Sequence, residues 1–102
     1  MAVIKILLVD DSQTVLMTER TVLARSGYEV ITATSAGEGV QKALRERPDL
    51  LLVDADMPRV SGLEACRRLA QDPLTAMIPV VLMVPPTVPA PPQADATWRA
   101  VR

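Results

Sequence analysis

Four consecutive aliphatic residues, Leu50 to Val53, run directly into Asp54 and then into a segment rich in turn-forming residues. An unbroken apolar run of this length that ends in turn residues is typical of a strand in a parallel sheet covered on both faces. Ligands of open α/β sheets bind beyond the carboxyl ends of such strands. The sequence therefore predicts a buried strand that brings Asp54 to a candidate site, although an Asp at a strand end can also simply open a turn.

A second apolar run, Ile4 to Val9, ends in the same way, in Asp10, Asp11 and Ser12. Taken alone, these three residues are equally typical of a helix N-terminus, because Asp and Ser are favoured N-cap residues. If the two strands are parallel neighbours, three carboxylates converge. Crowded carboxylates raise one another's pKa unless a cation is bound, and a cluster of oxygen ligands open to water suits Mg²⁺. Asp10, Asp11 and Asp54 together therefore predict a Mg²⁺ site.

Apolar periodicity and turn residues predict alternating strands and helices along most of the chain. We expect strands over 4–9, 28–33, 50–53 and 78–84, and helices from 12 or 14 to 26, from 35 to 47 and from 61 to 70. The first helix has apolar residues at near-helical spacing, namely Val15, Leu16, Val22 and Leu23. The spacing of Ser35 and Glu38 predicts a capping box at the start of the second helix. Because each strand–helix–strand crossover is right-handed, this order predicts an α/β fold with a doubly wound parallel sheet.

Composition excludes several classes of function. The 102 residues make one small domain, and 11 basic against 12 acidic residues leave a net charge of −1 without the basic stripe that a nucleic acid would need. The absence of histidine excludes histidine-based catalysis. The single cysteine, Cys66, is expected to be a buried apolar residue. With no basic leader and no apolar run long enough to span a bilayer, we expect a cytoplasmic protein without membrane contact.

Three motifs occur in order along the chain: L-L-V-D-D-S at 7–12, L-L-V-D-A-D-M-P at 51–58 with Gly62 four residues on, and I-P-V-V at 78–81. In this order and spacing they closely resemble the receiver domain of bacterial two-component response regulators, over residues 3 to about 84. The resemblance implies a flavodoxin-like receiver fold that serves phosphorelay signal transduction rather than acting as an enzyme. It also implies that the partner is a sensor histidine kinase or a phosphotransfer protein.

The resemblance assigns a role to each acidic residue by its position. Asp54 would accept the phosphoryl group, Asp11 would bind Mg²⁺ directly, Asp10 would bind it through water, and Asp56 would bind it through the backbone carbonyl. The chemistry suits these residue types, since a carboxylate can attack the phosphorus of a phosphohistidine or a small phosphodonor. Mg²⁺ neutralises the phosphoryl oxygens while charge moves between them.

The chain departs from the family pattern after the fourth expected strand. In the family this strand ends in a Ser or Thr that binds the phosphoryl group, and a fifth strand ends in Lys followed by Pro. Here the aligned position is Val84 or Pro85, and the only lysines of the chain are Lys5 and Lys42, in the first strand and the second helix. Whether phosphorylation is functional without these two groups stays open at this point.

The segment 85–92 has five prolines in eight residues, which disfavours both a paired strand and a helix interior. We therefore expect a receiver-like domain over 1–84 and a proline-rich atypical tail over 85–102. The expected strand order is 2-1-3-4, with the fifth strand and the last helices missing. Self-association through the exposed edge of the fourth strand, or through the tail, would follow. Such a tail fits a receiver whose reading frame or boundaries were altered, and equally a natural short receiver-like protein.

Two other functions are compatible with parts of the sequence. A pseudo-receiver would act only as a protein-interaction module, independently of phosphorylation. A phosphatase of the haloacid dehalogenase type is suggested by the D-x-D spacing of Asp54 and Asp56. That motif normally follows the first strand of its fold, whereas here it follows the third.

Overall fold

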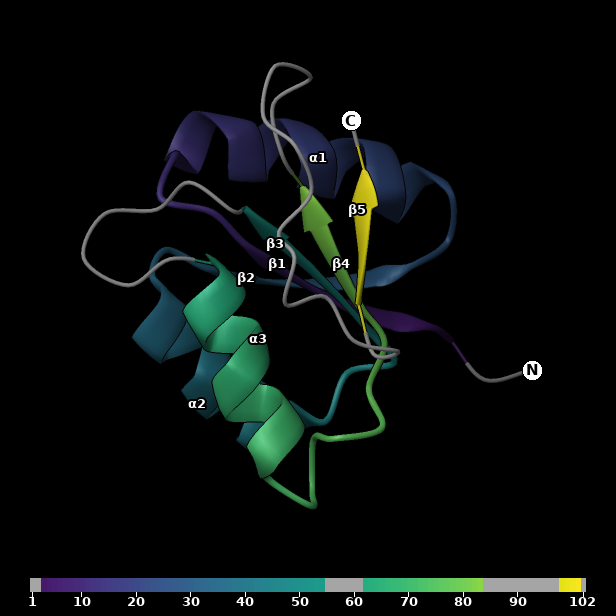
Figure 1. The fold of residues 1–102 in the computed structure, drawn as a ribbon. Helices are drawn as coiled ribbons and strands as arrows, with labels where there is room; N and C mark the ends of the chain where they lie inside the picture. The colour runs from purple at the N-terminus through teal and green to yellow at the C-terminus, as the bar shows by residue number, and fades with distance from the viewer. Residues whose placement is uncertain (1–2, 55–61, 84–97, 102) are drawn as a thin grey trace.

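The computed structural model describes residues 3–54, 62–83 and 98–101. Five strands and three helices follow one another within these ranges: β1 Lys5–Val9, α1 Gln13–Arg25, β2 Glu29–Ala33, α2 Ala36–Glu46, β3 Leu50–Asp54, α3 Gly62–Gln71, β4 Val80–Met83 and β5 Trp98–Val101. The strands form one parallel sheet in the order β2-β1-β3-β4-β5. In Figure 1, α1 lies on one face of the sheet, and α2 and α3 lie on the other. The predicted doubly wound α/β fold is confirmed, and no helix in these ranges is long and apolar enough to cross a membrane.

The prediction that the fifth strand is missing is wrong. Trp98–Val101 pairs in parallel with β4, with Trp98 opposite Val80 and Val101 opposite Met83. The prolines that disfavour a strand all lie before residue 93, whereas Trp98–Val101 is free of proline and contains Trp and Val, which favour strands. Because β4 is paired on both sides, the exposed β4 edge does not exist, and self-association through that edge has no basis.

Two of the remaining expectations for this part of the chain are not tested by the fold. One is the expected absence of the last helices. It concerns residues 84–97 and 102, which lie outside the ranges given above. The division into a receiver-like domain over 1–84 and a proline-rich tail over 85–102 stays a prediction, although β5 adds four residues of that tail to the sheet.

The two faces of the sheet carry separate apolar clusters. The larger cluster lies on the side of α2 and α3 and includes Leu7, Val9, Ala33, Ala36, Ala43, Leu51, Val53, Cys66, Leu69, Val80 and Leu82. The smaller cluster lies on the side of α1, where Leu16 packs with Ile6 and Leu8. Of the four apolar residues noted for their near-helical spacing in the first helix, Leu16 and Leu23 join this cluster, but Val15 and Val22 are 38% and 57% exposed. One stripe of the helix, which includes Leu16 and Leu23 at positions i and i+7, therefore packs α1 against the sheet.

Serine side chains begin the first two helices as the sequence predicts. The Ser12 hydroxyl accepts from the backbone N–H of Val15 at 3.3 Å, and the Ser35 hydroxyl accepts from the N–H of Glu38 at 3.1 Å. Glu38 Oε1 in turn accepts from the N–H of Thr34 at 2.7 Å, one residue before the N-cap. These contacts satisfy N–H groups that the start of α2 would otherwise leave without a partner.

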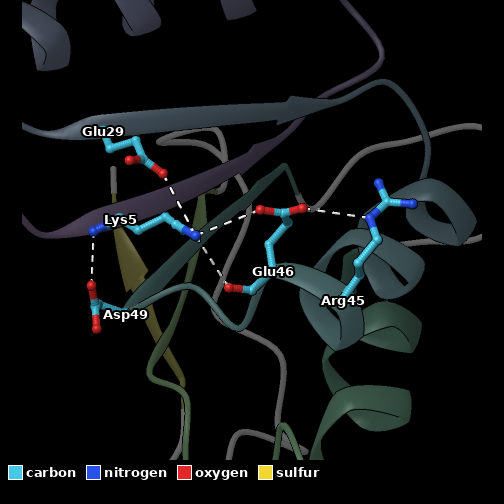
Figure 2. A network of polar contacts seen from close by, with 5 residues as sticks. All are labelled: Lys5, Glu29, Arg45, Glu46 and Asp49. Atoms are coloured by element: carbon cyan, nitrogen blue, oxygen red, sulfur yellow. Dashed lines mark hydrogen bonds and ion pairs between the residues drawn. The ribbon is translucent and has the colours of Figure 1, made fainter.

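Lys5 ties together three elements at the amino end of the strands (Figure 2). Its ammonium group lies 3.6 Å from Glu29 on β2 and 3.5 Å from Glu46 on α2, and it donates to the Glu46 carbonyl at 3.4 Å. Its backbone N–H donates to the Asp49 carboxylate at 2.8 Å, and Arg45 lies 3.5 Å from the second carboxylate oxygen of Glu46. Lys5 is thus engaged at the opposite end of β1 from Asp10.

Gly39 allows α2 to approach β1 closely. A Cβ atom at this position would lie 2.8 Å from Cγ2 and 3.2 Å from Cγ1 of Val9, a fully buried residue. Gly37, two residues earlier in the same helix, has nothing within 4 Å of the corresponding position. Close packing of α2 matters for the site, because Val9 is the residue that precedes Asp10.

We expect Gly39→Ala to lower the free energy of unfolding by about 1–2 kcal/mol, since overpacking outweighs the gain in helix propensity. Gly37→Ala is the matched control and should leave stability unchanged or raise it by up to about 1 kcal/mol. Urea unfolding of both variants measures the difference. In a Gly39→Ala/Val9→Ala double variant the added methyl group finds space, so the two effects should be less than additive. Equal stability of the two single glycine variants would contradict the close contact.

Candidate functional site

The register between β1 and β3 brings the acidic residues together. Val9 lies opposite Val53, so Asp10 and Asp54 leave adjacent parallel strands at the same edge of the sheet. One carboxylate oxygen from each of Asp10, Asp11 and Asp54 lies within 4.8 Å of the other two. Asp10 is buried, Asp54 is partly buried and Asp11 is exposed. The predicted convergence of the three carboxylates is confirmed.

Asp10 is held in place by backbone contacts on both sides. Its N–H donates to the carbonyl of Ala33 at the end of β2, at 3.1 Å. Its Oδ1 accepts from the N–H of Ser12 at 2.9 Å, and Ser12 caps α1. The helix N-terminus is therefore confirmed, with Ser12 as its N-cap, and the same turn presents Asp11 to the cluster. The Mg²⁺ site stays a prediction.

Burial and mutual repulsion raise the pKa of two carboxyl groups in this region. For Asp10, burial is the largest cause, and the charges of Asp54 and Asp11 add to it, while the N–H of Ser12 opposes the rise. For Glu19, burial again leads, followed by the charges of Asp10 and Asp54. Both carboxyl groups therefore resist ionisation in a region of negative potential, and a bound cation would relieve the repulsion.

Glu19 is a fourth acidic residue of this region that the sequence motifs do not indicate. It lies on α1, and its Oε2 is buried without a hydrogen-bond partner. The available signal is helical spacing, because Leu16, Glu19 and Leu23 follow one another at i, i+3 and i+7 on the stripe that faces the sheet. A charged residue on such a stripe indicates either a functional group or a group that needs a partner.

The other residues singled out in the sequence are not part of the described site. Asp56, the expected backbone ligand, lies outside the described residues. Lys42 donates to the carbonyl of Thr32 on β2 at 2.6 Å, and Lys5 belongs to the network at the opposite end of β1. Cys66 is buried in the cluster under α3, as expected.

A doubly wound parallel sheet in the order 2-1-3-4-5, with carboxylates clustered at the carboxyl ends of its strands, defines a flavodoxin-like α/β protein with a candidate cation site. The model of the response regulator receiver domain family matches residues 6–88. The chain belongs to this family.

Relatives and solved structures agree with this assignment. The chain is 42% identical over 77 residues to the alkaline phosphatase synthesis transcriptional regulatory protein PhoP of Bacillus subtilis, and 40% identical over 77 residues to protein PilH of Pseudomonas aeruginosa. Each match covers 76% of the chain, but only 31% of PhoP and 64% of PilH. The crystal structure of the N-terminal domain of a response regulator receiver protein from Methanoculleus marisnigri superposes with a TM-score of 0.81 at 36% identity, covering 89% of this chain and 72% of that one.

We expect Glu19→Gln to raise the free energy of unfolding at pH 7 in the absence of divalent metal, and to have less effect at pH 4. A carboxyl whose pKa is higher in the folded chain than in the unfolded chain makes the folded state less stable as the pH rises from the unfolded value, here near 4.5, through the folded one. At neutral pH the wild-type protein therefore carries the full penalty, and at pH 4 it is mostly relieved.

Urea unfolding at the two pH values measures this difference. Glu29→Gln is the matched control, because it removes the same charge from an exposed ion pair with Lys5 at the opposite end of the sheet, where such pairs contribute little. If Glu19→Gln changes stability by the same amount at both pH values, the ionisation of Glu19 is not perturbed by its surroundings.

Proposed function

We propose that this chain is the phosphoryl-accepting receiver of a two-component signalling pathway, with Asp54 as the acceptor. The observation that carries the proposal is the cluster of Asp10, Asp11 and Asp54, each of which places one carboxylate oxygen within 4.8 Å of the other two at the carboxyl edge of the sheet. A hard, oxygen-only cluster beside a strand-terminal carboxylate fits transfer of a phosphoryl group that carries its own negative charge.

Asp54 has the chemistry and the position of a nucleophile. One of its carboxylate oxygens would attack the phosphorus of a phosphohistidine or a small acyl phosphate, and the bond from phosphorus to the donor would break as the donor leaves with its electron pair. The product is an acyl phosphate on Asp54. The partial burial of Asp54 at the end of β3 supports its role as nucleophile, because the strand fixes the carboxylate and the residue still lies at the edge of the sheet.

The residues present fit a divalent cation, and Mg²⁺ is the ion that we propose. The exposed Asp11 suits direct coordination, whereas Asp10 is buried and already accepts from Ser12, which suits contact through a water molecule. The carbonyl of Asp56 is a further proposed ligand, on the resemblance to the family alone. When bound, such an ion neutralises charge on the phosphoryl oxygens.

The two lysines of the chain do not replace the lysine expected near the phosphoryl group. Lys5 contacts Glu29 and Glu46 at the other end of β1, and Lys42 donates to the carbonyl of Thr32. Residues 84–97, where a hydroxyl group such as that of Thr87 could occur, lie outside the described part of the chain. We therefore propose an acceptor that is chemically competent but slow.

The proposed partners follow from this chemistry. Receiver domains are signalling domains, and the phosphodonor of this one would be a sensor histidine kinase or a phosphotransfer protein. The chain matches less than two thirds of the length of PhoP and of PilH, so the proposal concerns the receiver alone. Nothing in the comparisons favours the pseudo-receiver or the phosphatase, and a cytoplasmic location without direct nucleic-acid binding stays a prediction.

Mg²⁺ or Mn²⁺ is expected to bind weakly to the wild-type chain, and Asp11→Ala should weaken binding by about tenfold or more. Removal of the exposed carboxylate leaves too little negative charge to offset dehydration of the ion. Isothermal titration calorimetry with the chloride salts measures this effect. Glu29→Gln removes one negative charge far from the cluster and should bind like the wild type. Equal affinity in the wild type and Asp11→Ala would place the ion elsewhere.

Acetyl phosphate with Mg²⁺ is expected to add at most one phosphoryl group, on Asp54, and to add it slowly. The missing preorganised donors are typically worth on the order of 10²–10³ in rate. Intact-mass spectrometry over time follows the reaction, and Asp54→Asn should gain no mass. Addition to that variant would refute Asp54 as the acceptor. A rate like that of a complete receiver measured in parallel would show that another group does the work of the lysine.

A further inference from the structure

β2 forms one edge of the sheet, because the strand order begins with it. In the described ranges no strand pairs with its outer side, and Val30, Ile31 and Thr32 are only partly buried. These three residues are β-branched, and β-branched residues favour strands. An edge of this kind can pair with a strand of another molecule unless it is protected.

The pairing with β1 shows which backbone groups of β2 face outwards. The N–H of Glu29 donates to the carbonyl of Ile4 at 2.9 Å, so the backbone groups of Glu29 point toward β1. Because backbone groups along a strand point to alternate sides, those of residues 31 and 33 also point toward β1. The N–H and carbonyl groups of Val30 and Thr32 therefore point to the open edge.

Two side chains of α2 occupy backbone groups along this edge. The Lys42 ammonium group donates to the carbonyl of Thr32 at 2.6 Å. Glu38 Oε1 accepts from the N–H of Thr34, just beyond the end of β2, at 2.7 Å. Glu38 and Lys42 have i, i+4 spacing, so they share one side of the helix. This side of α2 borders the edge of β2 through the two contacts.

A second copy of this chain is the partner that suits such an edge, because two identical edges can pair about a twofold axis. In an antiparallel pair centred on Ile31, Val30 of one copy would lie opposite Thr32 of the other. Each Val30 N–H would then donate to a Thr32 carbonyl, the group that Lys42 already occupies. Each ammonium group, 2.6 Å from that carbonyl, would have to leave it or become buried between the strands, and burial of a charge is costly.

We propose that Lys42 closes the outer edge of β2 to a second copy of this chain. Its ammonium group occupies the carbonyl of Thr32 and places a positive charge where the second strand would have to lie. The proposal gives a role to a lysine that the phosphoryl chemistry does not use. It does not depend on the proposed function, because neither Asp54 nor a bound cation takes part.

Lys42→Met tests the proposal, because it keeps an unbranched stem and removes the ammonium group. Arg45→Met is the matched control, since it removes one positive charge and adds the same side chain on the same helix, where Arg45 pairs with Glu46. Sedimentation velocity over a concentration series measures self-association. Lys42→Met should dimerise with an association constant about tenfold or more above those of the wild type and Arg45→Met, because the competing charge-assisted hydrogen bond is lost.

Amide hydrogen exchange locates the interface. In the Lys42→Met dimer the N–H groups of Val30 and Thr32 should become protected. The N–H of Ile31 faces β1 and reports whether the sheet is intact. Adding Val30→Pro to Lys42→Met removes an N–H that faces outwards and breaks no bond to β1, so the double variant should return to the monomer.

A Lys42→Met variant that stays as monomeric as the wild type would overturn the proposal. So would dimerisation without protection of Val30 and Thr32, or a wild type that itself pairs through β2. Equal dimerisation of Arg45→Met would also overturn it, because net charge rather than the position of Lys42 would then control association. If loss of Ile31 protection shows that Lys42→Met is unfolded, Lys42→Gln takes its place and the same outcomes decide.

Discussion

The parallel pairing of β1 with β3 is the interaction on which the site depends. Asp10 and Asp54 are far apart in the sequence, and only the register that sets Val9 opposite Val53 brings them to one edge of the sheet. A slip of one residue would turn every side chain of β3 to the other face of the sheet. The apolar residues of both strands prevent this slip, because Leu51 and Val53 are completely buried in one orientation only.

The pairing of β1 with β3 has an electrostatic cost, because it brings carboxylates close together. Three carboxylates that converge within 4.8 Å repel one another, and the pKa of Asp10 is raised first by burial and further by this repulsion. The buried aliphatic residues beneath them offset the cost, since each contributes roughly 1.5–3 kcal/mol when it leaves water. At the amino end of the same strands the charges are paired instead, with Lys5 between Glu29 and Glu46 (Figure 2). The sheet thus has one end where opposite charges are paired and one where acidic groups converge.

The sequence predicts those parts of the fold and of the candidate site that local sequence signals specify. Unbroken aliphatic runs identify β1 and β3, Ser12 and Ser35 identify the starts of α1 and α2, and strand-terminal acids identify the site. The fifth strand was missed because its signal is four residues long and follows a proline-rich segment, so only pairing with β4 defines it. Glu19 was missed for another reason. A glutamate is ordinary in a helix, and its burial follows from where Leu16 and Leu23 place α1 on the sheet.

Glu19 is coupled to the acidic cluster through charge alone. Since Asp10 and Asp54 raise its pKa, the potential at Glu19 depends on the net charge at the carboxyl edge of the sheet. A divalent cation among Asp10, Asp11 and Asp54 would make that potential less negative and would lower the pKa of the Glu19 carboxyl group. A phosphoryl group on Asp54 adds negative charge and has the opposite effect. Coupling of this kind is reciprocal, so the protonation state of Glu19 would shift the affinity of the cluster for a cation by the same free energy, without any movement of the backbone.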